Sequence, residues 1–303
     1  MTESQTITVL DKHQETSSNY SRAGEIISFE LEVAGKTVPF DIDVAAEKAT
    51  LADIVPPARK LSSKLAIAVR EGVEEKGQSV PCGKGCCACC NSLTPLSAPE
   101  VFRMREELLV LPTETSNRIL KSCIHTAERI LEKMGRIDCL LKDFSKNGKP
   151  RISQINKWYG ELKLTCPFLS ESLCMLYEQR PLACREHIVT GSSGPCQKDR
   201  KCRPNVVPMP VSILEALGQL AGELEQTDVE AVMLPFSFSW AQDNLQRAER
   251  VWPAVEMVRR FVEILKQKAS KNSKAVACRS ENLSRRFSHL RPHKSYPLSA
   301  LLL

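Results

Sequence analysis

Five of the 13 cysteines in this 303-residue chain lie within nine consecutive positions. Residues 81–90 read PCGKGCCACC, with cysteines at Cys82, Cys86, Cys87, Cys89 and Cys90. The two glycines of this segment let the backbone turn tightly, so that neighbouring sulfurs can face one centre. Cys86 and Cys89 have the two-residue spacing of a metal knuckle. Adjacent thiols that hold no metal are prone to oxidation, so the segment predicts a bound metal.

A second set of cysteines lies at wider spacing between positions 166 and 202. Its members are Cys166 in the sequence CPFL, Cys174, Cys184 in the sequence RPLACR, Cys196 and Cys202. Pro167 and Pro181 favour turns, and turns are needed if these cysteines are to converge. Thiolates are ligands of zinc, of iron and of iron–sulfur clusters, so the second set fits the same chemistry as the first.

Together the two segments resemble the YkgJ-type cysteine-cluster family, a zinc- or iron-chelating domain. The family pattern is C-x3-C-x2-C-C, then C-P-F-L with a further cysteine, then R-P-x-x-C-R with one more. The resemblance covers about residues 80 to 200 of this chain. It implies eight metal ligands, namely Cys82, Cys86, Cys89, Cys90, Cys166, Cys174, Cys184 and Cys196. Cys87 and Cys202 are extra to the pattern, which leaves their role open.

Eight thiols exceed the needs of one tetrahedral metal ion. They fit two four-thiolate zinc sites, or one iron–sulfur cluster with spare structural cysteines. The implied cofactor is therefore a zinc or iron ion, or a 4Fe–4S cluster. A zinc ion with four thiolates keeps a charge of about −2, which needs donors around it. Lys84, Arg180 and Arg185 lie beside the cysteines and are suited to that role, and His187 is a substitute ligand.

Three other cysteines are not expected to bind a metal. Cys123 lies on the apolar face of a predicted helix, and Cys139 stands beside two leucines, so both are expected in the core. Cys278 lies in a basic C-terminal segment and is given no role.

The rest of the chain predicts a mainly α fold with a small N-terminal β-hairpin. Residues 29–33 and 38–44 alternate apolar and polar around a glycine turn, and Pro39 suggests that its strand is at an edge. A further strand is expected at residues 6–10. Helices are expected at residues 57–76, from the capping box Ser97–Glu100 to Pro112, and at 115–135, 152–162, 211–225 and 241–268.

The expected organisation is a flexible N-terminus at residues 1–24 and a single globular domain at 25–265, with the cysteine-cluster core at 80–202. Residues 266–303 are expected to hold the end of the last helix and a disordered basic tail. They carry nine Lys or Arg and one acid, a net charge of +8, whereas the whole chain carries +6. The remainder is therefore near neutral, which argues against nucleic acid as a partner.

The N-terminal residues have no secretory pattern, and no stretch approaches the apolar length of a membrane span. A cytoplasmic location is therefore expected, where thiols stay reduced and serve more often as ligands than as disulfides.

The predicted function is metal binding through clustered thiolates. Because the family includes flagellin lysine methylases, a lysine N-methylase-like enzyme with an iron–sulfur cluster is one alternative. The spacing of Cys82, Cys86 and Cys89 also occurs in radical S-adenosylmethionine enzymes, but Ala88 stands where those favour an aromatic residue. No glycine-rich loop follows a strand to bind a methyl donor. A scaffold that meets an anionic protein partner through the basic tail is the other alternative.

Overall fold

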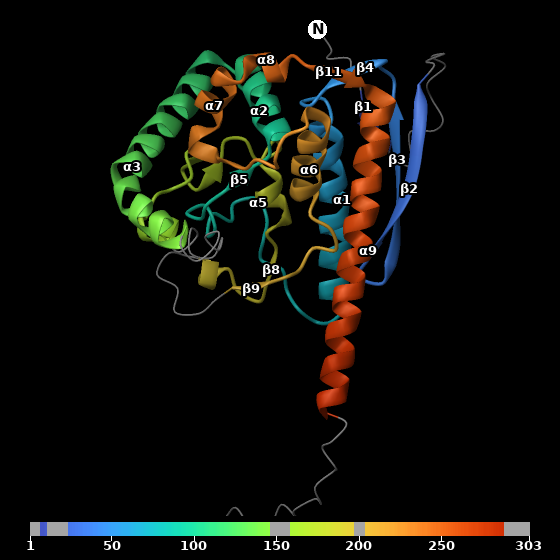
Figure 1. The fold of residues 1–303 in the computed structure, drawn as a ribbon. Coiled ribbons are helices and arrows are strands. Elements are labelled where there is room, and N and C mark those ends of the chain that lie inside the picture. Colours follow the sequence, from blue (N-terminus) through green and yellow to red (C-terminus); the bar gives the residue numbers. More distant parts are fainter. Residues whose placement is uncertain (1–6, 11–23, 146–157, 197–203, 288–303) are drawn as a thin grey trace, which may run out of the picture.

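The computed structural model describes residues 7–10, 24–145, 158–196 and 204–287 (Figure 1). Helices dominate and the sheets are small and antiparallel, which confirms the predicted fold class. The helices are α1 (Val55–Glu74), α2 (Ala98–Val110), α3 (Thr113–Ser145), α5 (Leu182–Glu186), η1 (Gly194–Cys196), α6 (Ile213–Glu225), η2 (Leu234–Phe236), α7 (Ser237–Asp243), α8 (Leu245–Ala248) and α9 (Ala254–Phe287). The strands are β1 (Ile7–Val9), β2 (Glu25–Val33), β3 (Lys36–Val44), β4 (Lys48–Thr50), β5 (Pro95–Leu96), β6 (Leu169–Ser170), β7 (Leu173–Cys174), β8 (Val189–Thr190), β9 (Asn205–Val206), β10 (Val232–Met233) and β11 (Val251–Pro253).

The N-terminal sheet has the strand order β1-β3-β2, which confirms the predicted hairpin and the strand before it. Ala34 and Gly35 form the two-residue turn, and both have a positive φ, as tight hairpin turns require. Phe29 and Phe40 face each other across the hairpin with ring centroids 5.2 Å apart. Alternate residues of β2 and β3 are buried, so one face of the sheet joins the core.

The prediction that Pro39 marks an edge strand is wrong for β3 as a whole, because β3 lies between β1 and β2. Strand β1 pairs only with residues 42–44, and the last contact on that side runs from Leu10 N–H to the Asp41 carbonyl. Within the described residues, Pro39 therefore lies in a part of β3 whose only strand partner is β2. The missing N–H of proline costs no ladder hydrogen bond there.

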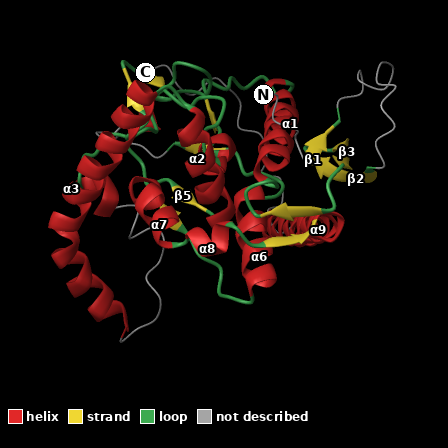
Figure 2. Ribbon diagram, turned by 90° about the horizontal axis from the view of Figure 1, so that it is seen from above, coloured by secondary structure: helices red, strands yellow, loops and turns green. Residues whose placement is uncertain are grey.

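The main core lies between the N-terminal sheet and the helices α1, α6 and α9. A second apolar cluster joins α2, α3 and α7 to the segment that carries Cys166 and Cys174. Figure 1 and Figure 2 show α3 on one side of the molecule and the hairpin on the other, with α1, α6 and α9 between them. The cysteine segments thus connect two packed halves of one fold.

Most predicted helices are present, with two corrections. The expected helix at residues 241–268 is broken into α7, α8, β11 and α9, because Pro253 disfavours a helical residue before it and β11 pairs with β4. Helix α9 then runs to Phe287, past its expected end, since this stretch has no Pro or Gly and is rich in Ala, Lys and Arg.

Helix α3 also extends beyond its expected range of 115–135. Of the helix expected at residues 152–162, positions 158–161 are helical, and positions before 158 lie outside the described residues. The same holds for most of the expected flexible N-terminus and for the final part of the basic tail. In the described part of the chain, no helix has both the length and the apolar character needed to cross a bilayer.

Candidate metal centre

The first cysteine segment is a succession of tight turns between α1 and β5. Three backbone hydrogen bonds define it, from Cys86 N–H to the Gly83 carbonyl (3.1 Å), from Cys90 N–H to the Cys87 carbonyl (3.0 Å) and from Ser92 N–H to the Cys89 carbonyl (3.0 Å). Gly85 has φ +91°, a left-handed conformation that side chains rarely adopt. The predicted need for a glycine turn is therefore confirmed at this position.

The second segment begins with a short hairpin and ends in α5. Strands β6 and β7 place Cys174 opposite Leu169, and both residues of the intervening turn have a positive φ. Helix α5 begins just after Pro181, and Cys184 N–H donates to the Pro181 carbonyl (3.0 Å). The N–H of Cys166 donates to the Cys90 carbonyl at 2.6 Å, which joins the second segment directly to the first.

The thiols of the two segments lie close enough to shift one another's ionisation. The Cys90 thiol donates a hydrogen bond to Cys89, and this bond, burial and the charges of Cys166 and Cys184 raise the pKa of Cys90. Cys82 is linked to the same group, since burial, Cys86 and Cys89 raise its pKa. The connected set holds seven of the eight predicted ligands, namely Cys82, Cys86, Cys89, Cys90, Cys166, Cys174 and Cys184.

Burial is the main influence on the deepest of these thiols. It raises the pKa of Cys166 to about 12 and also raises the pKa of Cys184 and Cys174. Cys89 is the exception, because the hydrogen bond from Cys90 and the charge of Arg180 lower its pKa to about 7. A metal ion must therefore displace protons from most of the cluster in order to bind.

The other cysteines are placed as follows. Cys196, the eighth predicted ligand, is buried in η1 and its N–H donates to the Ser193 carbonyl. Cys87 is half-buried in the first segment. Cys123 is buried in the second apolar cluster, as expected. Cys202 and the side chains of Cys139 and Cys278 lie outside the described residues.

The ten described cysteines are all free thiols. Among the described residues, no three Cys, His, Asp or Glu side chains lie close enough together to hold a metal ion. The chemistry of the set suits a thiophilic metal, because its members are neighbouring cysteine sulfurs from two segments of tight turns. Binding would require these side chains to draw closer together.

Of the basic residues expected beside the thiols, Arg180 acts on Cys89 and Arg185 lies near Cys184. The Arg180 guanidinium stacks on the Tyr177 ring at 4.3 Å and lowers the pKa of Cys89, while Lys84 lies 5.8 Å from the same ring. Arg70 of helix α1 was not predicted from the sequence, and its guanidinium donates to the Cys82 carbonyl. Arg70 lies outside both cysteine motifs in the sequence, so no local pattern indicates this contact.

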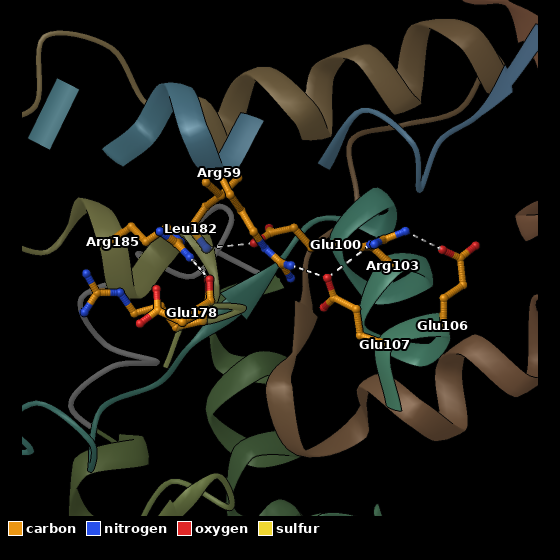
Figure 3. A network of polar contacts seen from close by, with 9 residues as sticks. Arg59, Glu100, Arg103, Glu106, Glu107, Glu178, Leu182 and Arg185 are labelled. Carbon is orange, nitrogen blue, oxygen red and sulfur yellow. Dashed lines mark hydrogen bonds and ion pairs between the residues drawn. The ribbon is translucent and has the colours of Figure 1, made fainter. Parts of the chain in front are cut away.

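A buried polar network fixes the helix that carries Cys184 (Figure 3). Glu100, at the start of α2, accepts hydrogen bonds from Leu182 N–H (2.8 Å) and from Ser97 N–H (3.1 Å). The second bond belongs to the predicted capping box, which is present. Burial raises the pKa of Glu100. Arg185 extends the attachment, with one guanidinium nitrogen donating to the Glu178 carbonyl and another to Ser63 Oγ of α1 (2.8 Å).

Comparison with known proteins found no matching family model, curated protein or solved structure. The likeness to the YkgJ-type family therefore rests on the cysteine motifs themselves.

Proposed function

We propose that the protein binds a zinc or iron ion, or a 4Fe–4S cluster, through thiolates from both cysteine segments. The observation that carries the proposal is the direct junction of the segments, where Cys166 N–H meets the Cys90 carbonyl. Around this junction, thiols separated by about a hundred positions influence one another's ionisation. Neighbouring reduced thiols are the ligand chemistry that soft metals select.

The residues that would hold the metal are those of the connected set, together with Cys196. When bound, zinc would cross-link the two halves of the fold, and an iron–sulfur cluster would also add the capacity to carry an electron. Arg180 is placed to stabilise thiolate charge, since it already favours the ionised form of Cys89. The resemblance to a chelating family supports the same assignment.

The test is purification of the full chain without oxygen, followed by metal and sulfide analysis and a visible spectrum. A brown protein that contains iron and sulfide indicates a cluster, and a colourless protein that contains zinc indicates thiolate sites. Metal-free protein in which every thiol can be titrated, after the same anaerobic handling, would rule the proposal out.

Serine variants sharpen the assignment. Cys89→Ser and Cys184→Ser each remove one sulfur from a different segment, and both should lower the bound metal per chain. Cys87→Ser is the matched control, because Cys87 lies in the same loop and falls outside the motif. Equal metal content in all three variants would contradict the ligand assignment.

A further inference from the structure

A cavity of about 260 Å³ lies against the cysteine segments, between helix α1 and the region of α5. Three arginines, Arg70, Arg180 and Arg185, are among the residues that line it. Ala66, Ile67 and Ile188 form an apolar part of the wall. The volume corresponds to about eight or nine waters at roughly 30 Å³ each, so the cavity suits a small molecule.

The three arginines are not neutralised by ion pairs. Within the described residues, none of them pairs with an Asp or Glu, and no carboxylate lines the cavity. Their partners are neutral oxygens: Arg70 donates to the Cys82 carbonyl, and Arg185 Nε donates to the Arg180 carbonyl (3.0 Å). The carboxylate that acts on Arg185 from nearby belongs to Glu178, which is exposed. Three arginines without a carboxylate ion pair thus surround one small cavity.

One donor in this group has no partner among the residues that the structure describes. The Nε of Arg180 is buried and makes no hydrogen bond, although its guanidinium is held in place by the Tyr177 ring. The Tyr177 ring holds the planar Arg180 group at a fixed angle, so that the group is ordered before any ligand arrives. Guanidinium groups match oxyanions closely, because their donors point in fixed directions.

From these observations we propose that the cavity binds a small oxyanion, the phosphate or carboxylate head of a molecule whose short apolar part packs on Ala66, Ile67 and Ile188. This goes beyond metal binding, since the site is formed by the arginines and the cavity whether or not a metal is present. Cys82 and Cys184 also line the cavity, so the bound anion would adjoin the proposed metal centre. A cavity this small has no room for a dinucleotide or a polymer end of several residues.

Isothermal titration calorimetry on the anaerobically purified full chain tests the proposal. The probes are inorganic phosphate and butyrate, each titrated at constant ionic strength in chloride. Saturable binding of at least one probe at one site per chain is expected, and the probe that binds identifies the head group. Absence of binding by both probes would overturn the proposal.

Two matched pairs of variants locate the binding. Arg70→Gln should weaken it about tenfold or more, the usual effect of losing a charged hydrogen-bond donor. Arg118→Gln removes the same charge from the exposed surface of α3 and should leave it unchanged. Ile67→Glu adds a carboxylate at the cavity wall and should abolish binding. Ile124→Glu adds a carboxylate on α3, at a residue with the same 57% exposure, and should leave binding unchanged.

Unchanged binding in both Arg70→Gln and Ile67→Glu would overturn the assignment to this cavity. Metal content is measured on the same samples, which separates the two proposals. Metal-free protein that still binds the anion would refute the metal centre alone, and metal-loaded protein that binds neither probe would refute the anion site alone.

Discussion

Removal of the Glu100 carboxylate should loosen the attachment of α5, the helix that carries Cys184. Glu100 is fully buried and accepts from Leu182 N–H (2.8 Å), Ser97 N–H (3.1 Å) and Ser97 Oγ (3.0 Å). In Glu100→Ala, two buried backbone donors lose their acceptor.

The size of the effect follows from these bonds. Each buried N–H left without a partner costs about 1–3 kcal/mol, so the gross loss is about 2–6 kcal/mol. The variant no longer has to bury a polar carboxyl group, and the free energy saved in this way offsets part of the loss. We therefore expect the free energy of unfolding to fall by about 2–4 kcal/mol, together with a lower metal content.

Urea denaturation followed by circular dichroism, at fixed metal and reductant concentration, measures the change. Glu106→Ala is the control on the same helix, because the Glu106 side chain is 46% exposed and, among the described residues, its ion-pair partner is Arg103 at 3.3 Å. Surface pairs of this kind contribute about 0–1 kcal/mol. If Glu100→Ala and Glu106→Ala differ by less than about 0.5 kcal/mol, the argument that Glu100 fixes α5 is refuted.

Three further predictions concern pH, a buried ion pair and the C-terminal segment. Burial raises the pKa of Glu100 above its usual 4.5, so its protonation favours the folded state at low pH and this contribution is lost as pH rises through the raised pKa. Denaturant titrations should therefore show the stability of the wild type falling, relative to Glu100→Gln, as pH rises from 4.5; parallel curves would contradict this. Glu107→Gln removes the partner of the buried Arg59 at 2.5 Å and should cost about 3–5 kcal/mol, whereas Glu223→Gln at the surface should cost less than about 1 kcal/mol by the same assay. Deletion of residues 272–303 should leave the thermal midpoint and the metal content unchanged but abolish salt-sensitive binding to an anionic resin; binding that survives would exclude the tail as its source.

The features that the sequence predicted correctly are local ones. Alternation around Gly35 predicted the hairpin, and the capping box at Ser97 predicted the start of α2, because each pattern is complete within a few residues. The turn at Gly85 was also predicted from its immediate neighbours in the sequence. In each case the backbone conformation depends on neighbours in the chain, so the pattern alone contains the information.

The features that escaped prediction depend on distant partners. The pairing of β11 with β4 interrupts what looked like one long helix, and no local pattern at Trp252 shows that Ala49 will lie opposite. The position of Pro39 beyond the reach of β1 likewise depends on where a separate strand ends. Long-range strand pairing depends on how the whole chain packs, so the pattern of consecutive residues does not predict it.

The same reasoning explains why the cysteines were found and the cavity was not. Closely spaced cysteines indicate metal binding from the sequence alone, whereas Arg70 is one charged residue on an amphipathic helix. Only the fold brings it to the Cys82 carbonyl and to the arginines of the second segment. Arg70 and Arg185 both brace the cysteine loops, through bonds to backbone carbonyls, and line the cavity. Since bonds to neutral carbonyls leave their charge uncompensated, bracing the loops and attracting an anion are compatible roles for the same side chains.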